Sequence, residues 1–283
     1  GVDCGTQSVR AIAFNLEGEV ITESQQKIPI DTPKPGWTEQ DPQTWWDATC
    51  QVLKKISAEI GKKNILGVGI SYQRESFVTL DKNGNQLRPA ILWNDQRALR
   101  EAEKMSEEFG SNVFRRTTGK PLDTLVAATK IKWMKENEKT EFDKITNILD
   151  TGGYIHWKLT GNMVSPMAGA DTLGLLDINS RKWSENILDY LGLNSEILPT
   201  IVHSGTIVGN ISPEASSETG LSTQTPVVAV GGDGQVFAVG VNALNREVAL
   251  TLGTGVAWGV HTSSCKHSEY FRTMIGCLPD SYY

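Results

Sequence analysis

The chain opens with GVDCGTQSVRAIAF (residues 1–14), and a shorter echo, ALTLGTGVAWG, stands at residues 249–259. Each stretch is an apolar strand, a polar Gly-Thr turn and a second apolar strand. Such turns expose backbone N–H groups and a hydroxyl that can hold phosphate oxygens. Two related turns in one chain indicate duplicated halves that hold one polyphosphate from both sides.

The composition excludes several classes of protein. The chain has 283 residues, of which 27 are basic and 33 acidic, and no basic run indicates nucleic-acid binding. No apolar stretch approaches the ~20 residues that span a membrane. The four cysteines are scattered without a C-x-x-C pair, which disfavours a zinc site or a disulfide framework. These features predict a cytoplasmic globular protein without a nucleic-acid or membrane partner.

Strand and helix signals alternate along the chain. Apolar runs between turn residues indicate strands, and Asp41-Pro42 supplies a cap and a first residue typical of a helix start. Alternation of this kind predicts an α/β architecture around a largely buried sheet. We expect three strands within residues 1–30 and others at 65–70, 77–81, 90–93 and 226–230, with helices from Asp41 onward and at 95–109, 123–138, 150–159, 184–191 and 235–242.

Six short motifs follow one another along the chain. They are DCGTQS (3–8), PGWTEQDP (35–42), YQRE (72–75), ILWNDQR (91–97), GGD (231–233) and LGTG (252–255). With these motifs in this order, the chain resembles the FGGY carbohydrate kinases, which have the actin-like ATPase fold, a ribonuclease-H-like α/β fold. The resemblance implies a first domain over residues 1–244 and the truncated start of a second at 245–283.

The resemblance also implies a reaction, the ATP-dependent phosphorylation of a sugar or polyol hydroxyl. Phosphoryl transfer needs positioning, neutralised charge and a carboxylate that accepts the proton of the attacking hydroxyl. Asp233 follows a buried strand between two glycines, and in the family this aspartate is the catalytic base. Asp3 stands beside the first Gly-Thr turn, where its carboxylate is expected to help hold Mg²⁺.

The phosphate-binding residues are expected in the two Gly-Thr turns. In the first turn, Gly5, Thr6, Gln7 and Ser8 are expected to line the phosphate tail of ATP. Arg10 is a candidate for the same site, with an exposed strand arginine as the alternative. The second turn is expected to contribute Gly253, Thr254 and Gly255.

The sugar pocket is expected around the Gln73-Arg74-Glu75 motif, because a charged pair can form bidentate hydrogen bonds to a vicinal diol. The alternative is a salt bridge at the end of a strand. Glycerol kinases use the matching Arg-Glu pair, and Trp93 and Gln235 are further candidate pocket residues together with Asp233.

Other positions argue against glycerol as the substrate. Leu125 replaces an aromatic contact of glycerol kinases, Gly234 separates Asp233 from Gln235, and residues 87–95 look like the xylulokinase branch. This mixture of glycerol-kinase-like and xylulokinase-like features indicates a pentulose such as xylulose or ribulose. A glycerol or other polyol kinase, an autoinducer-type kinase and, from another class, a non-kinase actin-like ATPase stay open.

Two further expectations concern the whole chain. In the family the adenosine pocket comes mainly from the second domain, so residues 1–283 alone are expected to bind ATP poorly and to show no kinase activity. Residues 130–135, KIKWMK, are expected to form a solvated helix face. A homodimer is left open.

Overall fold

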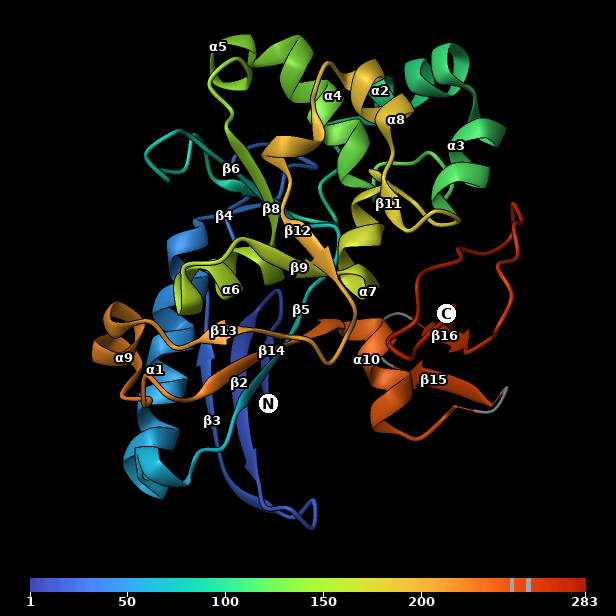
Figure 1. Cartoon of the computed structure of the whole chain (residues 1–283). Helices are drawn as coiled ribbons and strands as arrows, with labels where there is room; N and C mark the ends of the chain where they lie inside the picture. Colours follow the sequence, from blue (N-terminus) through green and yellow to red (C-terminus); the bar gives the residue numbers. More distant parts are fainter. Residues whose placement is uncertain (245–246, 253–255) are drawn as a thin grey trace.

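The computed structural model describes residues 1–244, 247–252 and 256–283 (Figure 1). Its main sheet has the order β13-β14-β5-β1-β2-β3, in which β14, β5 and β1 run parallel and the other pairs are antiparallel. The three strands expected within residues 1–30 are confirmed. The strands are β1 (Val2–Cys4), β2 (Ser8–Phe14), β3 (Val20–Lys27), β5 (Val68–Tyr72), β13 (Ile207–Asn210) and β14 (Pro226–Gly232).

The central strand β5 begins three residues later than the apolar run predicted. Ile65 and Leu66 precede the strand, and Leu66 is exposed. Pairing with β1 and β14 fixes the strand at Val68–Tyr72. The apolar run therefore indicated the strand but not its register, which the neighbouring strands decide.

Helices α1 (Pro42–Ile60) and α6 (Thr151–Thr160) pack on the main sheet, and α9 (Pro213–Thr219) packs on both helices. The predicted start of α1 is confirmed, because the Asp41 side chain accepts a hydrogen bond from the Gln43 N–H at 2.9 Å. Trp45 and Trp46 of this helix are fully buried in the core that it shares with the sheet.

A second lobe lies at the top of Figure 1, around a small sheet with the order β4-β7-β6-β8. Its own apolar core contains Phe77, Phe114, Ile131 and Leu188. The lobe contains β4 (Glu39–Gln40), β6 (Phe77–Leu80), β7 (Ala90–Ile91), β8 (Asn147–Asp150), α2 (Leu99–Met105), a π-helical turn (Ser106–Gly110), α3 (Ser111–Thr118), α4 (Ala127–Asn137), α5 (Lys139–Phe142) and α8 (Glu185–Leu191).

Short elements join the two lobes. They are β9 (Val164–Pro166), α7 (Met167–Ala170), β10 (Leu176–Asp177), β11 (Lys182–Trp183), β12 (Thr200–Val202) and the 3-10 turns Asp171–Leu173 and Ser195–Ile197. A further 3-10 turn, Lys62–Asn64, lies between α1 and β5 in the first lobe. Strands β9 and β12 pair with each other in parallel, and β9 contacts β14.

Two sequence predictions for this lobe need correction. The helix expected at 95–109 begins only at Leu99, because Asp95 bonds to Arg97 and to the Thr38 N–H in a turn, and it continues through α2 into the π-helical turn that ends at Gly110. The KIKWMK segment is not a solvated face, since Lys130 is fully buried and Lys132 nearly so. Buried carbonyl groups of the preceding segments accept the Lys130 protons, and a sequence pattern cannot reveal such acceptors.

The last part of the chain begins with α10 (Asp233–Gly240), which follows β14 directly. The hairpin β15 (Val248–Leu252) and β16 (Val256–Val260) forms a sheet of its own in the described chain. Its apolar side chains Leu250, Leu252 and Trp258 are exposed, as expected for strands without further partners. Residues 262–283 then return to the second lobe. No helix within the described ranges is long and apolar enough to cross a membrane.

Candidate active site

The first Gly-Thr turn joins β1 to β2 and is held by hydrogen bonds from three directions. The Gly5 N–H donates to the Ser8 carbonyl at 3.0 Å, and the Ile28 N–H donates to the Gln7 carbonyl at 3.0 Å. The Thr6 carbonyl accepts a bond from the buried amide of Gln40 at 2.7 Å. The turn is therefore fixed before any ligand binds.

Ser8 and Arg10 follow the turn on β2 and contact the same residue of β3. The Gln25 amide donates to the Ser8 hydroxyl at 2.8 Å and accepts a bond from the Arg10 guanidinium at 3.2 Å. Arg10 is exposed and lies directly across from Asp3 in the β1–β2 pair. Arg10 is therefore an exposed strand residue, and it also lies beside the candidate site.

Thr6 connects the turn to two residues of the predicted sugar pocket. Its hydroxyl donates to the Gln73 Oε1 at 3.1 Å and accepts a bond from the Trp93 Nε1 at 3.0 Å. Trp93 keeps about two fifths of its surface exposed, whereas Gln73 is buried and also accepts a bond from Ser76. Gln73 therefore holds the turn through a buried hydrogen bond, and the partly exposed Trp93 lies beside the turn.

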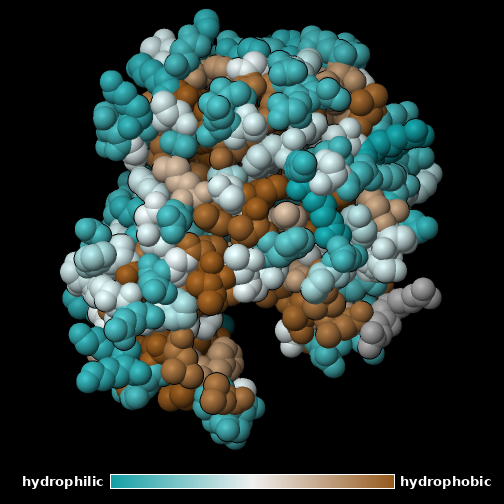
Figure 2. Space-filling model, in the orientation of Figure 1, coloured by the Kyte–Doolittle hydropathy of each residue, from teal (hydrophilic) through white to brown (hydrophobic). Residues whose placement is uncertain are grey.

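Asp3 and Asp233 face one hollow. The Asp3 carboxylate accepts a bond from the Ser71 hydroxyl at 3.1 Å, and Asp233 is the first residue of α10. Loss of water around the Asp3 carboxyl raises its pKa, and the negative charge of Asp233 adds to this shift. Arg10 lines the same hollow. Figure 2 shows the molecule hollowed between the β2–β3 hairpin and the part formed by α10 and β15.

Arg74 contacts the predicted base directly. Its Nε lies 2.8 Å from the Asp233 Oδ1, and about half of the Asp233 side chain is exposed. A Cβ at Gly232 or Gly234 would lie 2.5 Å or 2.7 Å from the Arg74 side chain. The two glycines around Asp233 therefore leave the space that Arg74 occupies.

Glu75, the residue after Arg74, contacts a residue near the end of the chain. Its backbone has φ = +60°, a left-handed conformation that is uncommon for a residue with a side chain. The buried carboxylate contacts the Arg272 Nη1 at 2.7 Å. Arg272 was not among the predicted site residues, because nothing in the local sequence signals a partner almost two hundred positions away.

A second buried ion pair lies behind α10, and sequence reasoning missed it too. Lys120 and Asp171 are fully buried, and the Lys120 Nζ lies 2.6 Å from the Asp171 Oδ2. Burial lowers the pKa of Lys120, while the Asp171 charge acts in the opposite direction. The Asp171 Oδ1 also accepts a bond from the Gln235 amide at 3.3 Å. Gln235 therefore lies on the inner side of α10, against this pair.

The donor set near Asp3 fits Mg²⁺. Proteins hold this ion through one or two carboxylates, with waters and substrate phosphates as the other ligands. Asp3 and Asp233 supply such carboxylates beside the phosphate turn. Among the described residues no group of three or more His, Cys, Asp and Glu side chains forms an all-protein metal cage. The second phosphate turn, Gly253, Thr254 and Gly255, lies outside the described residues.

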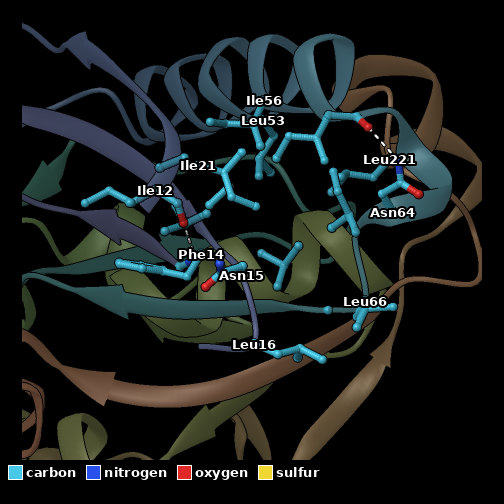
Figure 3. Close-up of a pocket in the computed structure, with 18 of the residues that line it drawn as sticks. Ile12, Phe14, Asn15, Leu16, Ile21, Leu53, Ile56, Asn64, Leu66 and Leu221 are labelled. Carbon is cyan, nitrogen blue, oxygen red and sulfur yellow. Dashed lines mark hydrogen bonds between the residues drawn. The ribbon is translucent and has the colours of Figure 1, made fainter. Parts of the chain in front are cut away.

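A separate cavity of about 490 Å³ lies between α1 and the β2–β3 hairpin (Figure 3). Its lining is mainly aliphatic and includes Ile12, Ile21, Leu53 and Leu221. The cavity adjoins Phe14 at the end of β2, whereas the Gly-Thr turn precedes the start of this strand. We therefore assign no part of the phosphate chemistry to this cavity.

Known proteins match most of the chain. The family model described as the N-terminal domain of the FGGY family of carbohydrate kinases matches residues 1–240. Xylulose kinase of Escherichia coli (strain K12) is 34% identical over 262 residues, which are 92% of this chain and 54% of that protein. Glycerol kinase of Thermococcus onnurineus (strain NA1) is 32% identical over 263 residues, 90% of this chain and 52% of that protein.

Solved structures agree with this assignment. The crystal structure of a xylulose kinase from Brucella ovis is 28% identical and matches with a TM-score of 0.94, over 100% of this chain and 59% of that one. The chain spans about half the length of the curated relatives it matches. Its fold is the actin-like ATPase fold of their N-terminal domain, and the chain belongs to the FGGY family of carbohydrate kinases.

Proposed function

We propose that the protein transfers the γ-phosphoryl group of ATP to a hydroxyl of an open-chain sugar, with a pentulose such as xylulose or ribulose as the substrate. The observation that carries this proposal is the position of Asp233. Its carboxylate shares a hollow with Asp3 near the Gly-Thr turn, and on its other side it contacts Arg74. A base at this point lies between a phosphate site and a sugar site.

Each residue then has a distinct role. Asp233 accepts the proton of the attacking hydroxyl, and Arg74 orients this carboxylate through the bond from its Nε. Arg74 and Glu75 bind sugar hydroxyls, with Trp93 as the wall toward the turn. Gly5, Thr6, Gln7 and Ser8 bind phosphate oxygens through the turn. Asp3 holds Mg²⁺, which neutralises phosphate charge when it is bound.

The choice of a pentulose depends on sequence features and not on overall identity. Identity is 34% to a xylulose kinase and 32% to a glycerol kinase, so it does not separate the two substrates. Leu125 stands where glycerol kinases carry an aromatic contact, and Gly234 separates the base from Gln235. Glycerol and other polyols are therefore the second substrate class to test.

A substrate screen with ADP release as the readout tests the proposal. The complete natural protein is incubated with Mg·ATP and, one at a time, xylulose, ribulose, glycerol, gluconate and no sugar. We expect the highest kcat/KM with a pentulose. Higher kcat/KM with glycerol would replace the pentulose with a polyol. ADP release that is the same with and without sugar would favour a non-kinase ATPase.

The domain boundary and the location of the protein complete the proposal. We place the end of the first domain at residue 244, between α10 and β15, with the second Gly-Thr turn in the following domain. A cytoplasmic location fits the supply of ATP and the scattered, unpaired cysteines. Limited proteolysis of the natural protein checks the boundary, because cleavage is expected at exposed segments between domains.

A further inference from the structure

The acid of the predicted sugar pocket has its ion-pair partner outside the matched family domain. Glu75 contacts Arg272 at 2.7 Å, whereas the family model ends at residue 240. Glu75 is nearly fully buried and has a left-handed backbone. A backbone of this kind costs free energy and persists where the surrounding structure holds it, which is common at functional sites.

The segment around Arg272 is anchored on three residues of the preceding chain. The Thr273 N–H donates to the Gly119 carbonyl at 2.8 Å, and the Ile275 N–H donates to the Asp171 carboxylate at 2.9 Å. Between them, the Met274 sulfur lies 3.0 Å from the Arg74 Nη1. Two of these anchors also contact predicted site residues, since Asp171 bonds to Gln235 and Arg74 to Asp233, so the segment of Arg272 is held against the candidate site.

Gly119 shows how closely this segment approaches. Its φ is +78°, and a Cβ there would lie 2.3 Å from the Thr273 carbonyl oxygen. Only a residue without a side chain leaves room for Thr273 at this distance. The contact between residues 119 and 273 therefore depends on the glycine at position 119.

Four charges alternate across the site. Asp233 pairs with Arg74, and the next residue, Glu75, pairs with Arg272. The Arg272 Nε and Nη2 are buried and have no hydrogen-bond partner within the described ranges. A buried carboxylate that loses its cation is strongly destabilised, so Arg272 stabilises the Glu75 side chain in its buried position.

We propose that Arg272 is a positioning residue of the sugar site, which holds the Glu75 carboxylate in the orientation that binds substrate hydroxyls. Substrate recognition then requires the segment around residues 272–275 in addition to the matched domain. This inference depends on the proposed function, because it assigns Glu75 to the sugar. It adds a residue that acts through Glu75 and not on the phosphoryl group.

Variants of Arg272 test the proposal in the complete natural protein, with the best sugar from the substrate screen. Arg272→Gln removes the charge, Arg272→Lys keeps it, and Arg181→Gln is the matched control. Arg181 pairs with the exposed Asp280 in the same terminal segment, at 3.2 Å. We expect Arg272→Gln to raise the KM for the sugar about ten- to one-hundredfold, because breaking a buried ion pair leaves the Glu75 carboxylate without its counter-charge. The kcat should change less than the KM, because ground-state binding is lost.

Two further measurements separate positioning from a merely structural role. Arg272→Lys should restore part of the KM, and Arg181→Gln should leave it unchanged. In a double-mutant cycle with Glu75→Gln, the second substitution should add little, because Arg272 acts through Glu75. An unchanged KM, or effects of the two substitutions that simply add, would overturn the inference while the kinase function stands. If the wild-type protein phosphorylates no sugar, the proposed function and this inference fall together.

Discussion

The Nε of Arg74 donates a hydrogen bond to the Oδ1 of Asp233 at 2.8 Å, although 159 positions separate the two residues. Arg74 follows β5, and Asp233 follows β14, its parallel neighbour. The carboxyl ends of parallel neighbours meet at one edge of the sheet, where α/β proteins bind their ligands. The sheet thus brings a cation of the sugar pocket onto the carboxylate that is proposed as the base.

Replacing the base should abolish turnover and leave the fold intact. Asp233→Asn keeps the shape and can still accept a bond from Arg74, but its amide cannot take a proton. Loss of a general base lowers kcat by about 10²- to 10⁴-fold. A coupled ADP assay measures kcat, and Asp280→Asn, at another Arg-paired carboxylate, is the control. Activity of Asp233→Asn within a few-fold of wild type would remove the residue from this role.

Replacing Asp3 should weaken nucleotide binding more than sugar binding. Asp3→Ala removes a carboxylate that is proposed to hold Mg²⁺ beside the phosphate turn, while Arg74 and Glu75 stay in place. Calorimetric titrations with Mg·ATP analogue and with sugar measure the two affinities separately. Asp47→Ala, at an exposed position on α1, controls for the loss of one negative charge. Equal losses for both ligands would contradict the assignment of Asp3 to the metal.

The buried Lys130 should stabilise the fold. Its ammonium group donates to the carbonyls of Leu92, Trp93 and Leu125 at 2.8, 2.9 and 3.2 Å. Burial lowers its pKa to about 8, so the group is still mostly charged at neutral pH.

Lys130→Met tests this role, because it leaves those carbonyls without a donor. The loss should be about 1–3 kcal/mol of the free energy of unfolding in urea. Lys135→Met, on the exposed side of the same helix, should change the free energy of unfolding by less than about 0.5 kcal/mol. A stability of Lys130→Met equal to wild type would show that the three bonds contribute nothing net.

His156 should make the fold less stable in mild acid. The residue is fully buried, its Nδ1 lies 2.8 Å from the Val164 carbonyl, and burial lowers its pKa to about 4. In the unfolded chain the ordinary pKa of histidine is about 6.5, so below this pH the unfolded state binds a proton that the folded state does not. The free energy of unfolding therefore falls as the pH drops from 6.5 toward 4, by about 3 kcal/mol for this group.

Urea titrations between pH 4 and pH 8 measure this dependence. His156→Asn keeps a side-chain donor but cannot take up a proton in this range, so its profile should be flatter than that of wild type. The difference between the two profiles should grow as the pH falls below 6.5. Parallel profiles for the two proteins would assign the acid sensitivity to other groups.

Local sequence determined the parts of this protein that depend on residues close together in the chain. The Gly-Thr turn of residues 5–6 and the helix start at Asp41-Pro42 follow from the conformational preferences of single residues. The strand before Asp233 follows from its apolar run. These signals, in their order, also identified the family and the acid that is proposed as the base.

Tertiary structure decided the features that depend on distant partners. Pairing with neighbouring strands sets the bounds of β5 at Val68–Tyr72, and hydrogen bonds to carbonyl groups hold Lys130 in the core. The contacts of Arg74 with Asp233 and of Glu75 with Arg272 join residues 159 and 197 positions apart. A charged residue shows its sign in the sequence but not its partner, because the energy of an ion pair depends on distance and burial, which exist only in the folded chain.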